Sequence, residues 1–356
     1  MNFPGNERLF IGNMKDCYLG YSNYQSIRKH CASGGIISNF LIFLLDCKII
    51  DGALVCRSKV IDNKISYEVK IVTCSEDILD YASSVYFNIP LLEYIPMIKK
   101  FDGKIAFVGL PCQIRILRNL MKNDIILREK VFLIIGLFCG HNSRRNLLID
   151  VLNQKGIREF DVKEIIFRQG LWRGNMQVTL KDDKKISFPF QDFSIYQNLH
   201  FDSLKKCLFC VDHTAEDADI SCGDAWLSYL RNDPIKHSLI ITRTDFSNYF
   251  IHEMRRKGDI FLMQIEPEII YKAQKRSLIS HKSIEARSKI GKIFGYSITY
   301  PSEYYNTARW NDYLASFILI INIQISSNEK FRKYIFFIPK IILYPYLFLF
   351  KSLTNF

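Results

Sequence analysis

Two cysteines separated by two residues, Cys207 and Cys210 in KKCLFCVD, form a motif that can do chemistry. A Cys-x-x-Cys pair can bind zinc, bind an iron–sulfur cluster or exchange disulfides, because thiolates are both metal ligands and nucleophiles. A thioredoxin-type pair opens a helix directly after a strand, whereas this pair follows a polar loop. The motif therefore favours metal binding, which requires two further ligands.

Two more cysteines, Cys112 and Cys139, each follow a short apolar segment that predicts a buried strand. The segments span residues 105–110 in GKIAFVGLPCQ and residues 131–138 in KVFLIIGLFCGH. Ligands of open α/β sheets bind outside the carboxyl ends of the strands, so both thiols are expected at one such edge. The four cysteines then suit either one 4Fe-4S cluster or one tetrahedral zinc ion. The absence of a second Cys-x-x-Cys pair favours the cluster.

The elements that must hold these thiols indicate an α/β fold, with α+β as the alternative. Continuous apolar runs are typical of strands covered on both faces, which predicts a mostly parallel central sheet with flanking helices. Residues 36–45 predict a helix and residues 52–56 a strand. After Cys112, the sequence QIRILRNLMKN predicts a helix whose apolar face is formed by Ile114, Leu117, Leu120 and Met121.

The tripeptide Ser33-Gly34-Gly35 directly precedes the predicted helix at residues 36–45. Glycines before a helix N-terminus let backbone N–H groups approach an anion, so this segment is a candidate phosphate cradle. An ordinary loop-to-helix junction explains the same residues at least as well.

The other cysteines and the turn residues near the motifs are expected to be structural. Free cysteines in apolar segments behave as small core residues, which we predict for Cys47 and Cys56. We assign no ligand role to Cys17, Cys31, Cys74 and Cys222. Histidines in turns are usually exposed, so a proton-transfer role is the less favoured interpretation of His141 and His213. Two acids near the motif, Asp219 and Asp224, are interpreted as turn residues.

The 356-residue chain has a formal net charge of +12 that is concentrated in parts of the sequence. Residues 271–292 carry seven basic residues and one acid, which favours anionic partners such as phosphate-bearing cofactors or lipid headgroups. We find no nucleic-acid-binding motif and expect no nucleic-acid partner. The first residues have no secretory signal pattern, so we expect a cytoplasmic protein with reduced thiols.

Several separated motifs resemble, in order, the coenzyme F-420 hydrogenase/dehydrogenase beta-subunit family. They are CYLGYSNYQSIRKHCASGGIISNFLIFLL, GLPCQIRILRNL, GLFCGH, KKCLFCVD, ADISCGDAW and SLIITRTD, which together cover about residues 17–245. The resemblance implies an oxidoreductase that carries FAD beside a 4Fe-4S cluster. Such a protein passes hydride or electrons between the flavin, the cluster and a second cofactor or substrate. It does not identify catalytic residues.

The resemblance also implies which residues hold the cofactors. The cluster ligands fall on Cys112, Cys139, Cys207 and Cys210. The residues beside the flavin fall on Ser33, Gly34, Gly35, Gly109, Pro111 and Gln113. A guanidinium group matches phosphate oxygens, so Arg168 and Arg243 are candidates for binding cofactor phosphates, with structural ion pairs as the alternative.

Departures from the family's pattern leave a second class of function open. The chain starts after the ferredoxin-like segment of many relatives, so we expect a redox partner protein. Val85 stands where relatives have the lysine of a Ser/Thr-Lys-Tyr motif near the flavin. The alternative function is therefore a catalytically degenerate or zinc-binding accessory protein. Many bacterial relatives accompany genes of surface-polysaccharide synthesis, which suggests a substrate in that process.

The C-terminal region lies outside the resemblance. We expect a flavin and iron–sulfur domain at residues 1–270 and a basic, apolar, helical region at residues 271–356. The segment YIFFIPKIILYPYLFLFKS contains an unbroken apolar run, residues 341–350, that is too short to span a bilayer as a helix. Aromatic residues flanked by lysines suit a peripheral segment on the inner face of the membrane. A buried helix pair that closes the domain is the alternative.

Overall fold

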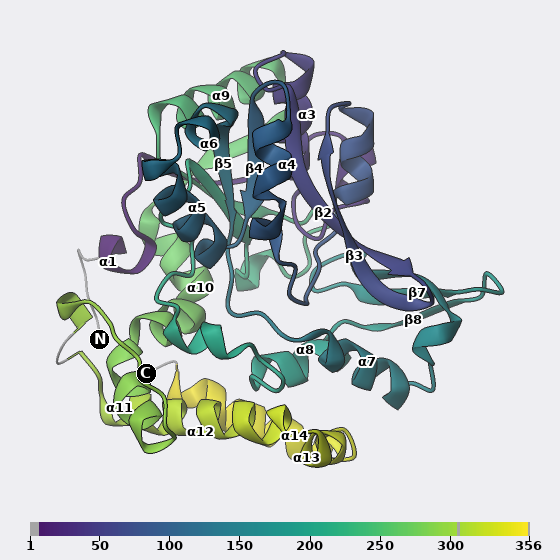
Figure 1. The fold of residues 1–356 in the computed structure, drawn as a ribbon, viewed down its shortest axis with the longest axis vertical. Coiled ribbons are helices and arrows are strands. Elements are labelled where there is room, and N and C mark those ends of the chain that lie inside the picture. The colour runs from purple at the N-terminus through teal and green to yellow at the C-terminus, as the bar shows by residue number, and fades with distance from the viewer. Residues whose placement is uncertain (1–6, 305–306, 355–356) are drawn as a thin grey trace.

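The computed structural model describes residues 7–304 and 307–354, and its centre is an eight-stranded sheet (Figure 1). Parallel neighbours form the middle of the sheet: β2 (Gly52–Ile61), β4 (Ile105–Gly109), β5 (Val131–Leu137) and β9 (Ile220–Asp224). Antiparallel strands flank them, namely β3 (Lys64–Val72) beside β2, and β10 (Ser238–Thr242), β1 (Asp16–Ser22) and β11 (Ile260–Gln264) beyond β9. Five of the eight strands run in one direction, and the predicted α/β fold is confirmed.

Helices cover both faces of the sheet, because the buried strands are apolar on both sides. On one face lie α4 (Ile95–Lys100), α5 (Pro111–Asn123) and α6 (Ile125–Lys130), and on the other lie α3 (Ile36–Asp46) and α9 (Asp245–Lys257). Within β4, Ile105 and Phe107 join the first core and Ala106 joins the second, as the two-residue period of a strand requires. Two short helices, α1 (Glu7–Ile11) and α2 (Gln25–Arg28), complete the N-terminal part.

A smaller antiparallel sheet extends the first core away from the main sheet. It contains β6 (Val162–Gln169), β7 (Asn175–Leu180) and β8 (Lys185–Pro189), and Ser58 of β2 donates a hydrogen bond to Ile165 O of β6 at 3.0 Å. The helix α7 (Arg145–Gln154) precedes this sheet and α8 (Gln191–Asn198) follows it. Apolar residues of both helices belong to the same core as those of α5.

The predicted elements agree with the structure in position, with two corrections to individual residues. Leu120, expected on the buried face of α5, is 43% exposed, because a helix turns about 100° per residue and carries it past the stripe of Ile114, Leu117 and Met121. Cys47, expected in the core, is exposed, because it caps the C-terminal end of α3. The predicted strand at residues 52–56 is the first half of β2.

Five helices follow β11, which confirms the expected helical C-terminal region. They are α10 (Pro267–Lys282), α11 (Ile284–Ile293), α12 (Trp310–Ser327), α13 (Glu329–Ile335) and α14 (Lys340–Leu353). Figure 1 shows the last three along one end of the molecule, beside α7 and α8. The two groups of helices are joined by polar contacts, because Asn322 donates to Leu199 O at 2.8 Å and Arg332 pairs with Asp150 at 2.8 Å. The expected boundary at residue 270 falls inside α10, and the division stays a prediction.

Within residues 7–304 and 307–354, no single helix is both long and apolar enough to cross a bilayer. α13 and α14 together meet these two criteria, but the chain bends by 103° between them.

Candidate functional site

The structure brings the four predicted ligand cysteines together at the carboxyl edge of the sheet. Cys112 lies in the first turn of α5, directly after β4, and Cys139 follows the neighbouring strand β5. Cys207 lies in the short 3-10 helix η4 (Lys205–Phe209), and Cys210 ends that turn. The charge of each of the other three thiols acts on Cys139, so all four lie within electrostatic range of one another. Among the described residues, no group of three or more His, Cys, Asp or Glu side chains has the spacing of ligands to one metal ion.

Three of the four thiols, Cys139, Cys207 and Cys210, lie in a poorly solvated environment that favours their protonated form when no metal is bound. Burial raises the pKa of Cys139 well above its ordinary value and that of Cys210 to about 12, and the charges of neighbouring thiols add to both effects. Burial also raises the pKa of Cys207, against the effect of the Asn142 backbone N–H, which donates to its Sγ at 3.3 Å. Deprotonation of this group of thiols therefore requires nearby positive charge, which a metal would supply.

Two contacts with His213 fix the turn that carries Cys139 against the loop after Cys210. Cys139 N donates to His213 O at 2.9 Å, and His213 Nδ1 lies 3.0 Å from Cys139 O. The expectation that His213 and His141 are exposed is wrong, because both are held at the sheet edge. His213 is 3% exposed, and the buried Nε2 of His141 has no hydrogen-bond partner among the described residues. Burial lowers the pKa of His141 to about 4 and that of His213 below its ordinary value.

A narrow pocket of ≈ 20 Å³ opens at the same edge of the sheet, where β9 ends and β10 begins. Three of its polar residues come from separate parts of the chain: Ser33 precedes α3, Arg168 is the penultimate residue of β6 and Asp224 ends β9. The complete lining is Ser33, Arg168, Trp172, Asp224, Ala225, Trp226, Leu230, Asp233, Ile235, Lys236 and His237. The pocket thus combines two aromatic indoles with basic and acidic side chains.

Arg168 forms one wall of this pocket and is fully engaged by protein groups. Its guanidinium pairs with Asp224 at 2.5 Å and donates to the Tyr86 hydroxyl at 3.2 Å, and the side chain is 3% exposed. It also lies over the ring of Trp226, 5.1 Å from the centroid. The sequence left two roles open for Arg168, binding of a cofactor phosphate and a structural ion pair. The structure shows the ion pair.

Of the Ser-Gly-Gly segment, only Ser33 lines the pocket. Its hydroxyl donates to His237 O at 2.9 Å. Gly34 packs against the sheet instead, because a Cβ at this position would lie 2.8 Å from Gly20 O and 2.9 Å from Ser238 N. Gly35 has a φ of 80° as the N-cap of α3, a conformation that favours glycine. The two glycines therefore have packing and backbone roles in addition to any contact with an anion.

The other residues that were predicted near the flavin have structural positions. They lie in the turn that carries Cys112, or they bind the N-terminal segment. Gln113 is 5% exposed and uses both ends of its amide, accepting from Leu110 N at 2.9 Å and donating to Ile89 O at 2.8 Å. Gly109 ends β4, Pro111 begins α5, and neither lines the pocket. Arg243 donates to Ile11 O, Asn13 O and Thr214 O at 2.6–3.1 Å, which fastens the N-terminal segment to the loop after Cys210.

Sequence reasoning missed several residues of the pocket, above all Lys236. Its ammonium donates to Cys31 O at 2.7 Å, and burial lowers its pKa to about 8. Trp172, which also lines the pocket, has a φ of 46°, and its ring centroid lies 5.4 Å from that of Trp226. The one sequence feature that could have indicated Lys236 is its position before an apolar strand. Such a pattern does not reveal at which edge of the sheet the residue lies.

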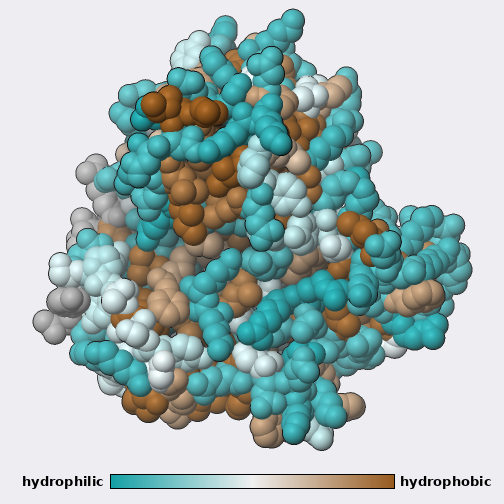
Figure 2. Space-filling model, in the orientation of Figure 1, coloured by the Kyte–Doolittle hydropathy of each residue, from teal (hydrophilic) through white to brown (hydrophobic). Residues whose placement is uncertain are grey.

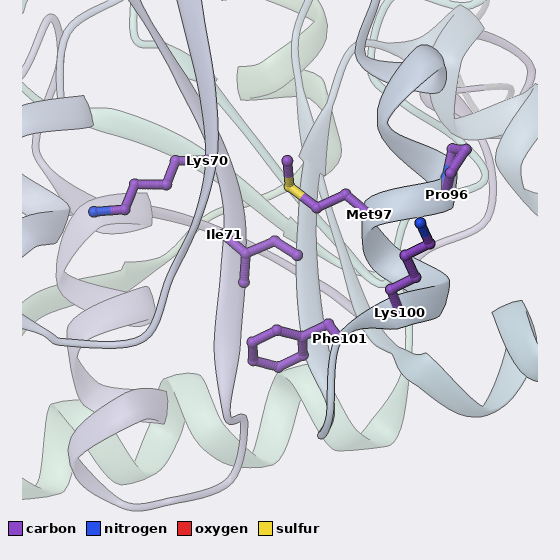
Figure 3. A pocket seen from close by; sticks show the side chains of 6 residues that line it. All are labelled: Lys70, Ile71, Pro96, Met97, Lys100 and Phe101. Atoms are coloured by element: carbon purple, nitrogen blue, oxygen red, sulfur yellow. The ribbon is translucent and has the colours of Figure 1, made fainter.

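A second hollow, of ≈ 560 Å³, lies on the surface between β3 and α4 (Figure 3). Figure 3 shows Ile71, Met97 and Phe101 around it, while the ammonium groups of Lys70 and Lys100 point away from the phenyl ring. Its six lining residues include no thiol, carboxylate or imidazole, so we assign no chemistry to it.

Comparison with known proteins identifies relatives over most of the chain. Two models of the family "Coenzyme F420 hydrogenase/dehydrogenase, beta subunit" match, its N-terminal model over residues 17–96 and its C-terminal model over residues 102–268. The chain is 27% identical over 252 residues to the coenzyme F420 hydrogenase subunit beta of Methanococcus voltae, a match that covers 70% of this chain and 84% of the relative. It is 30% identical over 253 residues to the coenzyme F420-dependent sulfite reductase of Methanocaldococcus jannaschii, covering 65% of this chain and 36% of that one.

Among solved structures, a chain of the F420-reducing [NiFe] hydrogenase complex from Methanosarcina barkeri is similar, with a TM-score of 0.62 and 20% sequence identity. The match covers 82% of this chain and 98% of that one, which shows a shared fold.

Proposed function

Because the chain belongs to the coenzyme F420 hydrogenase/dehydrogenase beta-subunit family, we propose that it is an iron–sulfur flavoprotein oxidoreductase. It would pass hydride or electrons between FAD, a 4Fe-4S cluster and a second cofactor or substrate. The observation that carries this proposal is the convergence of four cysteines at the carboxyl edge of the sheet, where the pocket around Arg168 and Lys236 also lies.

Cys112, Cys139, Cys207 and Cys210 would hold the cluster, whose chemistry is the exchange of single electrons. The donor types fit, because thiolates are the ligands of such clusters and the four thiols, from three segments of the chain, lie within electrostatic range of one another. The backbone N–H of Asn142 donates to Cys207 Sγ, and such hydrogen bonds to sulfur tune the potential of a cluster. Two contacts between Cys139 and His213, one between backbone groups and one from the His213 ring, keep the separate segments in register.

The pocket lined by Ser33, Trp172, Trp226 and Lys236 would hold part of the flavin, which exchanges hydride with a substrate and single electrons with a cluster. Its indoles offer flat apolar surfaces, and Lys236 offers a cation for an anionic group. The turn that carries Trp172 lies between Gly170 and Gly174, both with positive φ. Since the pocket is narrow, we infer that this turn moves to admit the ring.

The electron partner is proposed to be another protein. The similar solved chain is part of a hydrogenase complex, and the relative from Methanococcus voltae is named as a subunit. The sequence resemblance to bacterial relatives supports a substrate in surface-polysaccharide synthesis.

We also propose that the protein is cytoplasmic and docks peripherally on the inner face of the membrane through α12, α13 and α14. Figure 2 shows hydrophobic side chains along the edge of the molecule formed by α12. Exposed apolar residues of the three helices and of the turn between α13 and α14 are Trp310, Leu314, Phe317, Ile325, Phe331, Tyr334, Phe337, Ile341, Ile342, Tyr344, Phe348 and Leu349. Residues 331–356 contain four basic residues and no acid, which complements an anionic lipid surface.

Anaerobic purification followed by iron, sulfide, zinc and flavin analysis tests the cofactor proposal. We expect a brown protein with about four iron atoms per chain and bound FAD. Cys207→Ser should lose most of the iron, whereas the control Cys74→Ser, at an exposed thiol outside the group of four, should retain it. A colourless protein with one zinc per chain would support the accessory function instead, and iron without flavin would refute the flavin assignment.

A further inference from the structure

A buried arginine from the C-terminal helices reaches the Cys-x-x-Cys loop. Arg287 lies on α11, beyond both family-model matches, and is 4% exposed. Its guanidinium donates to Leu208 O at 3.1 Å and to Cys210 O at 2.9 Å, and both carbonyls belong to that loop. It also donates to Ser280 O and, at 2.9 Å, to His281 O, at the C-terminal end of α10.

The acceptors of Arg287 are all neutral carbonyl groups, and this is unusual for a buried cation. Buried charges are normally paired, because removing an ion from water is costly. Among the described residues, no carboxylate forms an ion pair with Arg287, and the anionic groups that act on it are the thiols of Cys210 and Cys207. Its positive charge is therefore opposed only when those sulfurs carry negative charge.

The rest of the neighbourhood does not supply that negative charge. His200 and His281 lie within electrostatic range of Arg287, and an imidazole is either neutral or positively charged. The carboxylate of Asp212, two residues after Cys210, accepts from Thr214 N and Glu216 N at 3.0 and 2.9 Å. Arg287 therefore remains a fixed cation beside the thiols of Cys207 and Cys210.

Fixing the loop would not by itself require a charge. The hydrogen bonds to Leu208 O and Cys210 O tie α11 to the loop, but a neutral amide makes bonds of the same kind without the cost of burying an ion. The burial of a full positive charge is favourable when an anion occupies the volume between the sulfurs.

We propose that Arg287 is a positioning residue that supplies the buried positive charge for an anionic thiolate-ligated cluster and raises its reduction potential. The inference rests on the proposed function. Reduction adds one negative charge to the cluster and its four thiolates, and a fixed cation nearby stabilises the reduced form more than the oxidised form. The helices after residue 270 thereby contribute a residue to the redox site.

Redox titration of the full-length, anaerobically purified protein, followed by electron paramagnetic resonance, tests this role. Arg287→Gln removes the charge and keeps a hydrogen-bond donor, so the midpoint potential should shift to a more negative value. Arg287→Lys keeps the charge, so its potential should stay close to that of the wild type even if some iron is lost. The control Arg158→Gln removes an exposed arginine that pairs with Asp161 away from the thiols, and it should leave the potential unchanged.

The outcomes separate this inference from the function on which it rests. A wild-type protein without an iron–sulfur cluster refutes the proposed function. A wild-type protein with the cluster and an Arg287→Gln variant of unchanged potential refutes only the role of Arg287. Where Arg287→Gln does not fold, Arg287→Lys decides the matter, because a lowered potential in a variant that keeps the charge contradicts a role based on charge.

Discussion

Asp202 shows at the residue scale how burial changes the behaviour of a charged group in this protein. It is 0% exposed, its Oδ1 pairs with Arg144 at 3.1 Å, and its buried Oδ2 has no partner among the described residues. Burial raises the pKa of this carboxyl to about 6, against the attraction of Arg144. Because the pKa is raised, the folded state binds a proton between pH 4 and pH 6 that the unfolded chain has released.

Asp202→Asn should therefore remove part of the pH dependence of stability. The free energy of unfolding of the wild type should fall, relative to the variant, by on the order of 2 kcal/mol as the pH rises from 4 to 6. Asparagine also tolerates the φ of 53° at this position. Urea unfolding across this pH range measures the difference. Asp183→Asn, at an exposed carboxyl paired with Lys163, is the control and should leave the slope above pH 4 unchanged.

At the scale of elements, Gly34 lies at the junction before α3. The sequence suggested that this glycine binds a ligand, and the structure shows that packing requires it. Gly34 brings the backbone into contact with β1 and β10 at once: its N–H donates to Ser238 Oγ at 3.0 Å, and its carbonyl accepts from Ser22 N at 2.8 Å. The position leaves no room for a side chain, because both nearest atoms to an added Cβ belong to the backbone.

Gly34→Ala should destabilise the protein by about 1–3 kcal/mol, because the backbone of two strands must move to accept the methyl group. Gly140→Ala is the matched control, since the only atom within 4 Å of its added Cβ is Ser277 Oγ at 3.7 Å. Chemical unfolding of the two cofactor-free variants compares them. Equal stability of the two would contradict the packing role of Gly34.

At the scale of the whole molecule, the C-terminal helices have two different faces. Leu343, Leu347 and Phe350 of α14 are buried in the core that also contains α7 and α8, whereas Phe337, Ile341 and Phe348 are 73–80% exposed. One face therefore closes the core, which was the alternative to membrane docking, and the other is exposed. The two interpretations of this segment are compatible.

Docking on lipid predicts that the full chain sediments with phosphatidylglycerol vesicles more than with phosphatidylcholine vesicles, and less at high salt. A variant with Phe337→Ser, Ile341→Ser and Phe348→Ser should bind at least about tenfold more weakly, because each side chain contributes more than 1 kcal/mol when buried. The control variant carries Ile116→Ser, Ile125→Ser and Ile126→Ser, on the exposed apolar surface over α5 and α6 visible in Figure 2. Equal binding of both variants would contradict the proposed surface.

The sequence by itself determined several elements and the candidate ligand residues. Apolar runs are a local property of the chain, so β4, β5 and α3 were predicted within a residue or two. The four thiols were predicted from residue type and from their positions after strands, because the carboxyl ends of parallel strands meet at one edge. Side-chain burial was less predictable: His213 was expected to be exposed and is buried, and Cys47 was expected in the core and is exposed.

Only the tertiary structure decided what surrounds the thiols. Arg287 is 77 residues from Cys210 in the chain, and Lys236 is 205 residues from the Cys31 carbonyl that it contacts. Whether a charge is buried, and which charge opposes it, depends on packing between segments that no local pattern connects. The sequence therefore specified which atoms can bind a metal, and the fold specified the electrostatic environment in which they would bind it.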